Sequence, residues 1–294
     1  HSEQVEFIMK KLFWVTTALV TLGGISVAAA DVSISGNTRF RYHTWSDDIA
    51  GSAGANNSAF ADDLQLWVNA DMAADSGLEY GSAFRMRAAG TVDRNYIYRR
   101  DEWGQLTLGR NWGPEYSRSL GADWRGTGVG TFNVASYGAN NKAITGSYTT
   151  MSGTAVKAAY TTPNMSGFKA GVSFADAGDA STADITAVAV NYTTNVMGDA
   201  AVRLGVMQES KSKNDTTAKE KRDEIGIEVT NGPLLVSAIK MNQKAGDDKK
   251  NATEFEIAFN ATDHIVLNMI HLNGKVNGGD HSGDKFKSTQ VGAA

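Results

Sequence analysis

The sequence predicts an all-β protein in which antiparallel strands run up and down to form a barrel. Three observations favour this fold: segments in which apolar and polar residues alternate, connections that alternate in length, and a hydrophobic leader with no later apolar helix. Alternation with a period of two places apolar and polar side chains on opposite faces of a strand. About 14 such segments follow one another along the chain.

The leader indicates the compartment. A basic start at residues 9–11 precedes an apolar run that ends in three alanines at residues 28–30. This order is typical of a secretory signal peptide, and the run is short for the competing interpretation of a transmembrane helix. We therefore divide the chain into upstream residues 1–8, a signal peptide at 9–30 and a single mature domain at 31–294.

The composition excludes several classes of function. The chain has 28 basic and 32 acidic residues, a net charge of −4, which argues against nucleic acid as a partner. It has 0 cysteines, so it forms neither disulfides nor thiolate metal sites. Paired aspartates such as Asp47 and Asp48 do not match the spacing of a calcium loop. We expect no cofactor and no metal.

The alternating segments carry charge on one face. Between residues 32 and 45 the even positions Val32, Ile34, Phe40 and Tyr42 are apolar, whereas the odd positions are polar. The segment at residues 78–87 alternates in the same way. Four arginines lie in these polar rows: Arg39, Arg41, Arg85 and Arg87. Because their charges must stay hydrated, the polar face must meet water.

The connections are of two kinds. Short links occur at residues 75–77, 102–104, 231–233 and 262–264. Longer polar links lie between them, at residues 46–59, 210–222, 244–251 and 277–284. Tight turns at one end and loops at the other are typical of outer-membrane barrels, whose periplasmic turns are short and whose extracellular loops are long.

Two architectures produce such alternation. A soluble sandwich or lipocalin-like barrel buries its apolar face, whereas a membrane barrel turns that face to lipid and its polar face to a lumen. The leader, the number of strands and the lack of a second apolar layer favour the membrane barrel. A barrel of about 16 strands has a lumen wide enough to hold water around the arginines.

Two stretches resemble a known family. Residues 95–114, "NYIYRRDEWGQLTLGRNWGP", are similar to general diffusion porins of Gram-negative outer membranes just before their third loop. Residues 154–176, "TAVKAAYTTPNMSGFKAGVSFAD", resemble the hairpin that follows that loop. The resemblance to the Gram-negative porin family implies a transmembrane antiparallel up-and-down β-barrel with 16 strands, assembled as a homotrimer in the cell outer membrane.

The resemblance also implies a pore constriction. Loop three of these porins folds inward, and here it corresponds to about residues 111–134. Arg110 matches an arginine of the barrel wall, and Glu115 and Asp123 are the acids of the loop. Such a constriction places loop acids opposite wall arginines. The positive charges of Arg118 and Arg125 on the same loop leave cation or anion preference open.

We therefore expect a channel for passive diffusion of small hydrophilic solutes and ions, surrounded by outer-membrane lipid and lipopolysaccharide. A surface or adhesion barrel with a plugged lumen is the alternative, and a soluble binding barrel is the third possibility. An enzyme is not expected, because the mature histidines show no pairing with a nucleophile. These histidines are His43, His264, His271 and His281.

The chain differs from the family pattern at its C-terminal end. It ends at Ala294 without the terminal aromatic residue that similar barrels carry, and about 14 strands are visible where the family has 16. Either the C-terminal end is truncated, or residues 141–162 hold two strands rather than one.

Residue parity assigns a group of aromatic side chains to the lipid-facing surface, where aromatic girdles lie at the membrane interfaces. Ordinary strand propensity would also favour tyrosine and phenylalanine in these segments. The group is Tyr42, Tyr80, Tyr96, Tyr98, Phe168, Phe174, Tyr192, Phe255 and Phe259.

Overall fold

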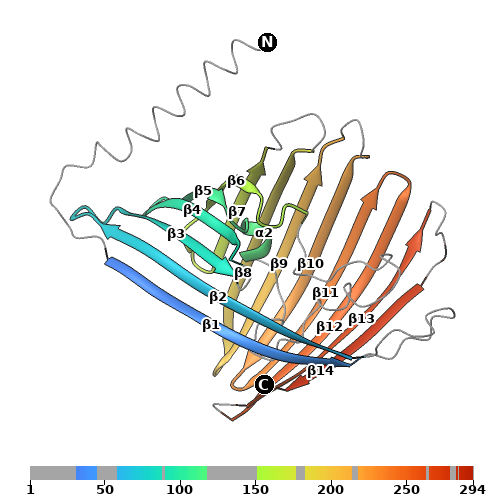
Figure 1. The fold of residues 1–294 in the computed structure, drawn as a ribbon. Coiled ribbons are helices and arrows are strands. Elements are labelled where there is room, and N and C mark those ends of the chain that lie inside the picture. The colour runs from blue at the N-terminus through green and yellow to red at the C-terminus, as the bar shows by residue number, and fades with distance from the viewer. Residues whose placement is uncertain are drawn as a thin grey trace.

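The protein is described by a computed structural model, in which fourteen strands and one short helix are defined among the described residues (Figure 1). The described residues are 31–44, 58–87, 90–117, 151–176, 183–213, 218–262, 265–278, 283 and 285–293. The upstream residues, the expected signal peptide and Asp123 lie outside them.

The strands are long and cover most of the described chain. The first seven are β1 (Asp31–Thr44), β2 (Ser58–Ala73), β3 (Glu79–Arg87), β4 (Val92–Asp101), β5 (Gly104–Arg110), β6 (Val156–Thr161) and β7 (Phe168–Ala175). The next seven are β8 (Ile185–Met197), β9 (Ala200–Lys211), β10 (Glu220–Asn231), β11 (Leu234–Ala245), β12 (Asp248–Thr262), β13 (Ile265–Asn277) and β14 (Lys285–Ala293). The helix α2 (Pro114–Ser117) follows β5.

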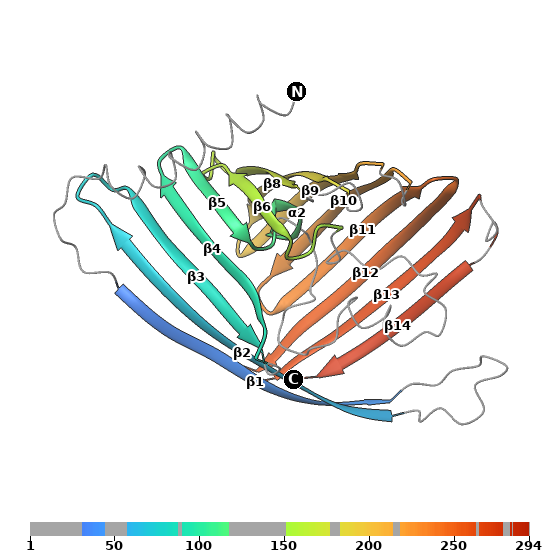
Figure 2. The ribbon, with the colours of Figure 1, turned by 45° about the horizontal axis from the view of Figure 1, so that its top comes forward.

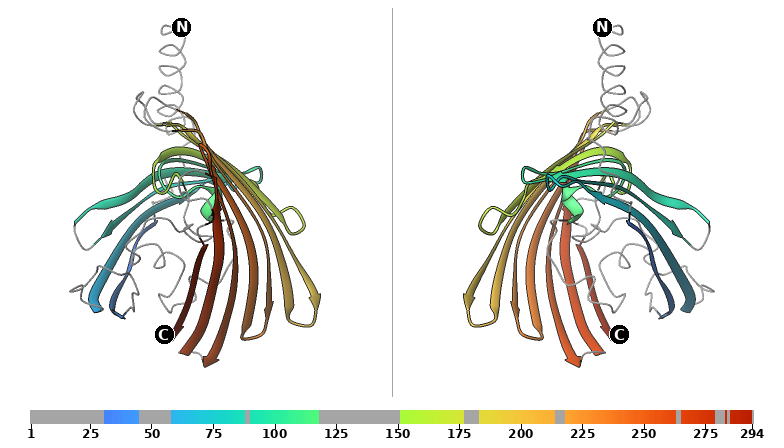
Figure 3. Two further views of the ribbon diagram at one scale, coloured as in Figure 1. Left: turned by 90° about the vertical axis from the view of Figure 1, so that its right-hand side faces the viewer. Right: turned by 90° about the vertical axis from the view of Figure 1, so that its left-hand side faces the viewer.

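Each strand pairs antiparallel with the next, in the order β1 to β14. The resulting sheet curves into a trough whose concave side holds α2 (Figures 2 and 3). Within the described residues β1 and β14 are the two edges and do not pair with each other, so the barrel is open at this point. The expected all-β, antiparallel, up-and-down architecture is confirmed.

The connections sort to two rims. We call one the short-turn rim, because the strands that end there are joined by short links, such as residues 74–78, 102–103, 198–199 and 232–233. At the other, the long-loop rim, more residues separate several successive strands, as between Thr44 and Ser58 and between Arg110 and Val156. One expected loop is wrong: most of residues 244–251 belongs to β11 and β12, and the link is only residues 246–247. Gly246 makes this reversal possible, since its φ is 59°.

The two faces of the sheet have the reverse of the polarity found in a soluble protein. Apolar side chains on the convex face are exposed, among them Val172, Leu204, Val236 and Ile257. The concave face buries polar and charged side chains, among them Arg85, Lys157, Glu224 and Glu256. Soluble sheets bury their apolar face, so this sheet is built to face an apolar surrounding on its outside.

The outward aromatic residues are only partly where parity placed them. Phe168, Phe174, Phe255 and Phe259 are exposed on the convex face, as expected. Near the short-turn rim, Phe168 contacts Tyr192 with ring centroids 4.4 Å apart. Trp103 stacks on Tyr160 at 5.8 Å, and the Tyr160 hydroxyl donates to the Trp103 carbonyl at 2.6 Å. Both pairs lie near the short-turn rim.

Tyr96 and Tyr98 lie on the concave face, so their assignment to the lipid side was wrong. Tyr96 is paired with the buried Ala83, and Tyr98 donates a hydrogen bond of 2.6 Å to Asp71. Parity could not decide the face here because Ile97 between them is also apolar, and only the register with β3 resolves it.

Helices contribute little to the fold. Among the described residues, no helix combines the length and apolar character that crossing a bilayer would need. The same part of the chain contains no cluster of three or more acidic or histidine side chains suited to a metal ion.

A charge placed on the convex face tests its contact with lipid. Ile257→Arg puts a guanidinium in the middle of the apolar rows and should lower the free energy of unfolding in lipid vesicles by about 2–4 kcal/mol. Thr253→Arg lies on the same face and strand but nearer the long-loop rim, so we expect a cost of about 0–1 kcal/mol. Urea unfolding followed by tryptophan fluorescence measures both. Equal costs for the two substitutions would show that the position of the charge between the two rims has no effect, which would contradict contact of this face with lipid.

Candidate pore lining and inner segment

The chain turns onto the concave face directly after β5. Pro114 opens α2, a position that suits proline because the first helical residue has no intrahelical partner for its N–H. The Tyr116 N–H donates to the Gly113 carbonyl at 3.1 Å and closes the turn. Residues 111–117 therefore leave the wall as a compact turn that points into the trough (Figure 3).

Small residues on the wall make room for α2. A Cβ atom at Gly171 would overlap Pro114, so only glycine lets the two backbones approach this closely. Gly171 is paired with Ala189, and Ala187 and Ala189 are almost fully buried. Short side chains on β7 and β8 thus create the depression that α2 fills.

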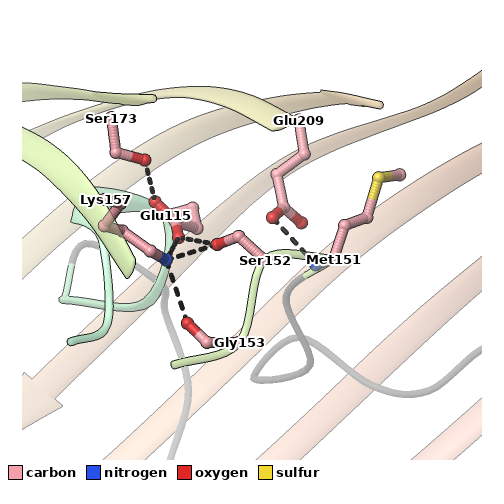
Figure 4. A network of polar contacts seen from close by, with 7 residues as sticks. All are labelled: Glu115, Met151, Ser152, Gly153, Lys157, Ser173 and Glu209. Atoms are coloured by element: carbon pink, nitrogen blue, oxygen red, sulfur yellow. Dashed lines mark hydrogen bonds and ion pairs between the residues drawn. The ribbon is translucent and has the colours of Figure 1, made fainter. Parts of the chain in front are cut away.

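The carboxylate of Glu115 anchors α2 to the wall (Figure 4). It accepts hydrogen bonds from Ser152 Oγ at 2.8 Å and Ser173 Oγ at 3.1 Å. Lys157 Nζ lies 3.2 Å from Glu115 Oε1, and the side chains of this ion pair are 1% and 0% exposed. A buried ion pair survives only where both charges are well compensated, and here three donors surround one carboxylate.

The far end of the long connection attaches to the same place. Lys157 Nζ donates to Ser152 Oγ and to the Gly153 carbonyl, the latter at 2.9 Å. The Met151 N–H donates to Glu209 Oε1 on β9 at 2.9 Å (Figure 4). Both described ends of residues 111–155 are therefore fastened to the inner wall. We call residues 111–117 and 151–155 the inner segment.

A basic cluster lies on β3 and β4. Arg85 Nε donates to Asp93 Oδ1 at 2.8 Å, and Arg85 also donates to Gln65 Oε1 at 3.1 Å. Arg87 Nε donates to Asp93 Oδ2 at 2.9 Å. Arg94 lies between two indole rings, 5.1 Å from Trp67 and 5.5 Å from Trp112 of the inner segment. Two guanidinium groups thus share the carboxylate of Asp93, and Arg94 adds a third positive charge beside Arg85, with which it is paired.

An acidic group occupies the other flank of the trough, on β9 to β12 (Figure 2). Its members are buried glutamates: Glu209, Glu224, Glu228, Glu254 and Glu256. Arg222 pairs with Glu224 and Arg203 with Glu228, both at 3.3 Å. Ser237 Oγ donates to Glu256 at 2.9 Å. Glutamates outnumber arginines on this wall, whereas arginines outnumber carboxylates in the basic cluster on β3 and β4.

Most of the expected site residues lie on the concave face or in its register. Arg85 and Arg87 lie on the concave face, and Glu115 is the anchor of the inner segment. Arg39 and Arg41 are paired with Asp63 and Ala61, in the register of the concave face. Only their backbone positions are described, and Asp123 is outside the described residues.

Arg110 is not on the lumen wall. It is paired with Asn95 of β4 and with Val156 of β6, which is exposed on the convex face, and Arg110 is itself exposed. The expectation rested on the resemblance alone, whereas the parity of β5 places Leu106, Leu108 and Arg110 on one face.

The glutamates of the acidic group were not among the expected site residues. Alternation with isoleucine or phenylalanine at residues 224–229 and 254–259 already sets four of them on the polar face of their strands. The pairing of Lys157 with Glu115 was not accessible in this way, because 42 residues separate them and the link between them has no regular pattern.

Among solved structures, the chain is similar to a porin refined at 1.8 Å resolution, with 18% identity, a TM-score of 0.62 and coverage of 90% of this chain and 89% of that one. Folded OmpT of Vibrio cholerae in its trimer form gives 13% identity, a TM-score of 0.60 and coverage of 90% and 82%. OmpF of Salmonella typhi in complex with daunomycin gives 13% identity, a TM-score of 0.61 and coverage of 89% of this chain and 85% of that one.

Because the sequence identities are low, the similarity to these structures shows a shared fold and no more. No curated protein is similar enough to this chain to count as a match. The family model for Gram-negative porins matches residues 15–294, nearly the whole sequence. With an outward apolar face, an inward charged face and this match, the chain belongs to the Gram-negative porin family.

Proposed function

We propose that the chain forms a water-filled channel in the Gram-negative outer membrane through which small hydrophilic solutes and ions diffuse passively. The observation that carries this proposal is the reversed polarity of the sheet. Charged side chains gather on the concave face while valine, leucine and isoleucine are exposed on the convex face. Such a distribution suits lipid outside and water inside.

The proposal includes the orientation of the barrel in the membrane and the way in which the chain is exported. The short-turn rim faces the periplasm and the long-loop rim faces outward, as in barrels of this class. Residues 9–30 act as a cleaved signal peptide that directs export, and residues 31–294 form the barrel domain. β1 begins at the short-turn rim, which supports this arrangement because the mature N-terminus would start on the periplasmic side.

The inner segment narrows the pore. Its two described ends are fastened to β6, β7 and β9, which supports the proposal that the loop at about residues 111–134 folds inward between them. The basic cluster on β3–β4 and the acidic wall on β9–β12 create a transverse field across the opening. A narrow mouth with low-dielectric walls strengthens that field and orients dipolar solutes. No tight binding is needed, because solutes must also leave.

The working assembly is a homotrimer surrounded by outer-membrane lipid and lipopolysaccharide. The trimer form of Vibrio cholerae OmpT supports this, since it shares the fold. We propose a channel rather than an enzyme, in which the polar side chains of the concave face keep the lumen hydrated. Arg39, Arg41, Arg85 and Arg87 are proposed as lumen residues, with Glu115 and Asp123 at the constriction.

Single-channel recording of residues 31–294 refolded into a planar bilayer tests this function. Stepwise conductance increments are expected, and increments in groups of three would support the trimer. A chain that migrates as a folded, heat-modifiable barrel but gives no conductance would contradict the channel and favour a surface barrel with a plugged lumen.

Neutralising the basic cluster should change ion preference. The variant Arg85→Gln with Arg87→Gln removes two positive charges and leaves Asp93 without its partners. The reversal potential in a salt gradient should therefore shift toward cation selectivity. Arg110→Gln is the control, because Arg110 lies in the register of the convex face. A shift of equal size in the control would contradict the assignment of faces.

Releasing the inner segment should widen the pore. Lys157→Met leaves the buried carboxylate of Glu115 without its counterion, and breaking a buried pair in this way costs about 3–5 kcal/mol. We expect larger and noisier single-channel currents, together with faster proteolysis between residues 111 and 155. Lys169→Met, a concave-face lysine outside this network, should behave as the parent chain does. Unchanged currents in Lys157→Met would show that the anchor does not hold the constriction.

A further inference from the structure

A β-bulge in β4 shapes the basic cluster of the concave face. Arg85 of β3 is paired with Arg94, and the next residue, Met86, is paired with Val92, so Asp93 is an extra residue in β4. Strand parity alone would put Asp93 on the face opposite to Arg94. A bulge re-aims side chains, and here it brings the Asp93 carboxylate to within 2.8 Å of Arg85 Nε. The cluster is therefore a locally built feature rather than a simple row of alternating residues.

The bulge divides the arginines of this cluster into two kinds. Arg85 and Arg87 both form ion pairs with Asp93. Arg94 is half-buried beside them, but within the described residues it forms no ion pair. Its Nε atom is buried and has no hydrogen-bond partner in this part of the chain. A buried donor without a partner costs free energy, so Arg94 has both charge and donors available to a ligand.

The guanidinium of Arg94 is surrounded by aromatic rings. Its Cζ atom lies 5.1 Å from the ring centre of Trp67 and 5.5 Å from that of Trp112. Trp112 in turn stacks on Tyr116, with ring centroids 4.1 Å apart. Tyr96 lies two residues further along β4 on the same face. Because the N–H groups of a guanidinium lie in its plane, an acceptor reaches Arg94 at its edge, between the two indoles.

We propose that Arg94 binds the carboxylate group of aromatic carboxylate solutes in the lumen. This inference names a solute class for the proposed channel and rests on that proposal, because solutes reach Arg94 only if the concave face meets water. A carboxylate accepts two parallel hydrogen bonds from the planar fork of a guanidinium. Arg85 and Arg87 keep Asp93 as their counterion, so the solute displaces no ion pair of the protein.

A carboxylate fits this position better than a tetrahedral oxyanion or a halide does. In a bidentate pair the two carboxylate oxygens lie in the guanidinium plane and stay clear of the indole faces. A phosphate also has oxygens above and below that plane, where Trp67 and Trp112 lie. A halide is a single atom, which gains nothing from a fork of two donors. The geometry therefore selects by shape as well as by charge.

The surroundings of Arg94 favour an aromatic body on the solute. A molecule held by its carboxylate at the guanidinium edge has Trp67, Trp112 and Tyr96 as its neighbours. Aromatic rings attract one another in edge-to-face and offset arrangements, beyond the apolar area that they bury. A small carboxylate without a ring would use the arginine alone. Binding can stay weak, since a solute that crosses a pore must also leave.

The test uses the refolded chain of residues 31–294 in detergent micelles. Benzoate is the probe, and saturation-transfer NMR, which detects weak ligands, measures its binding. Arg94→Lys keeps the positive charge but removes the planar fork, so the affinity for benzoate should fall at least about tenfold. Migration as a heat-modifiable barrel shows that each protein is folded.

Competition on the parent chain tests the solute class without any substitution. Acetate has the carboxylate but no ring, and inorganic phosphate has more charge but the wrong shape. Each should displace benzoate only at a concentration at least about tenfold higher than that of unlabelled benzoate itself. Displacement by either competitor at the same concentration as benzoate would overturn the proposal.

Arg100→Lys is the matched control. Arg100 lies on the same strand and face as Arg94 but nearer the short-turn rim, where it pairs with Glu79. This variant should bind benzoate as the parent chain does. Equal affinities of Arg94→Lys and Arg100→Lys for benzoate would also overturn the proposal, because the fork of Arg94 would then have no special role.

The same proteins separate this inference from the channel, because binding in micelles does not require conduction. If the parent chain binds benzoate as expected but gives no single-channel conductance, the channel is wrong and the carboxylate site stands. If the parent chain conducts and Arg94→Lys binds benzoate like the control, the carboxylate site is wrong and the channel stands.

Discussion

The reversed polarity of the sheet is the constraint on which the rest of the structure depends. A strand that crosses a bilayer must satisfy its backbone through its neighbours, and its outward side chains must be apolar. The fourteen strands meet the first demand by pairing in sequence, apart from the outer edges of β1 and β14. They meet the second with exposed residues such as Val236 and Ile257. The buried polar and charged side chains, such as Glu224 and Glu256, then lie on the concave face.

That concentration of polar groups explains how the inner segment is held. On an exposed surface an ion pair contributes little, but Glu115 and Lys157 are almost inaccessible to solvent and share their hydrogen bonds with two serines. Losing one partner would leave a buried charge, so the arrangement is retained as a unit. The depression around Gly171 gives the same segment a fixed position. Charge and shape therefore act together at one place on the wall.

Local alternation predicted much of the fold, because a period of two is a property of a strand by itself. It gave the strand-rich, meandering architecture and the inward rows of Arg85 and Arg87. It failed for Tyr96 and Tyr98, because Ile97 between them is also apolar and only the register with β3 decides the face. The position assumed for Arg110 failed because a family likeness took the place of strand parity. Contacts across the long connection, such as Lys157 with Glu115, depend on tertiary packing and leave no local pattern.

The central claim is that the concave face meets water while the convex face meets lipid. Cysteine labelling tests it most directly, because the chain has 0 cysteines of its own. Asn69→Cys on the concave face and Val68→Cys on the convex face occupy adjacent positions of β2. In lipid vesicles, a charged thiol reagent should modify Cys at position 69 rapidly and lower the single-channel conductance, and should leave position 68 unmodified. Rapid modification of position 68 with protection of position 69 would contradict the account.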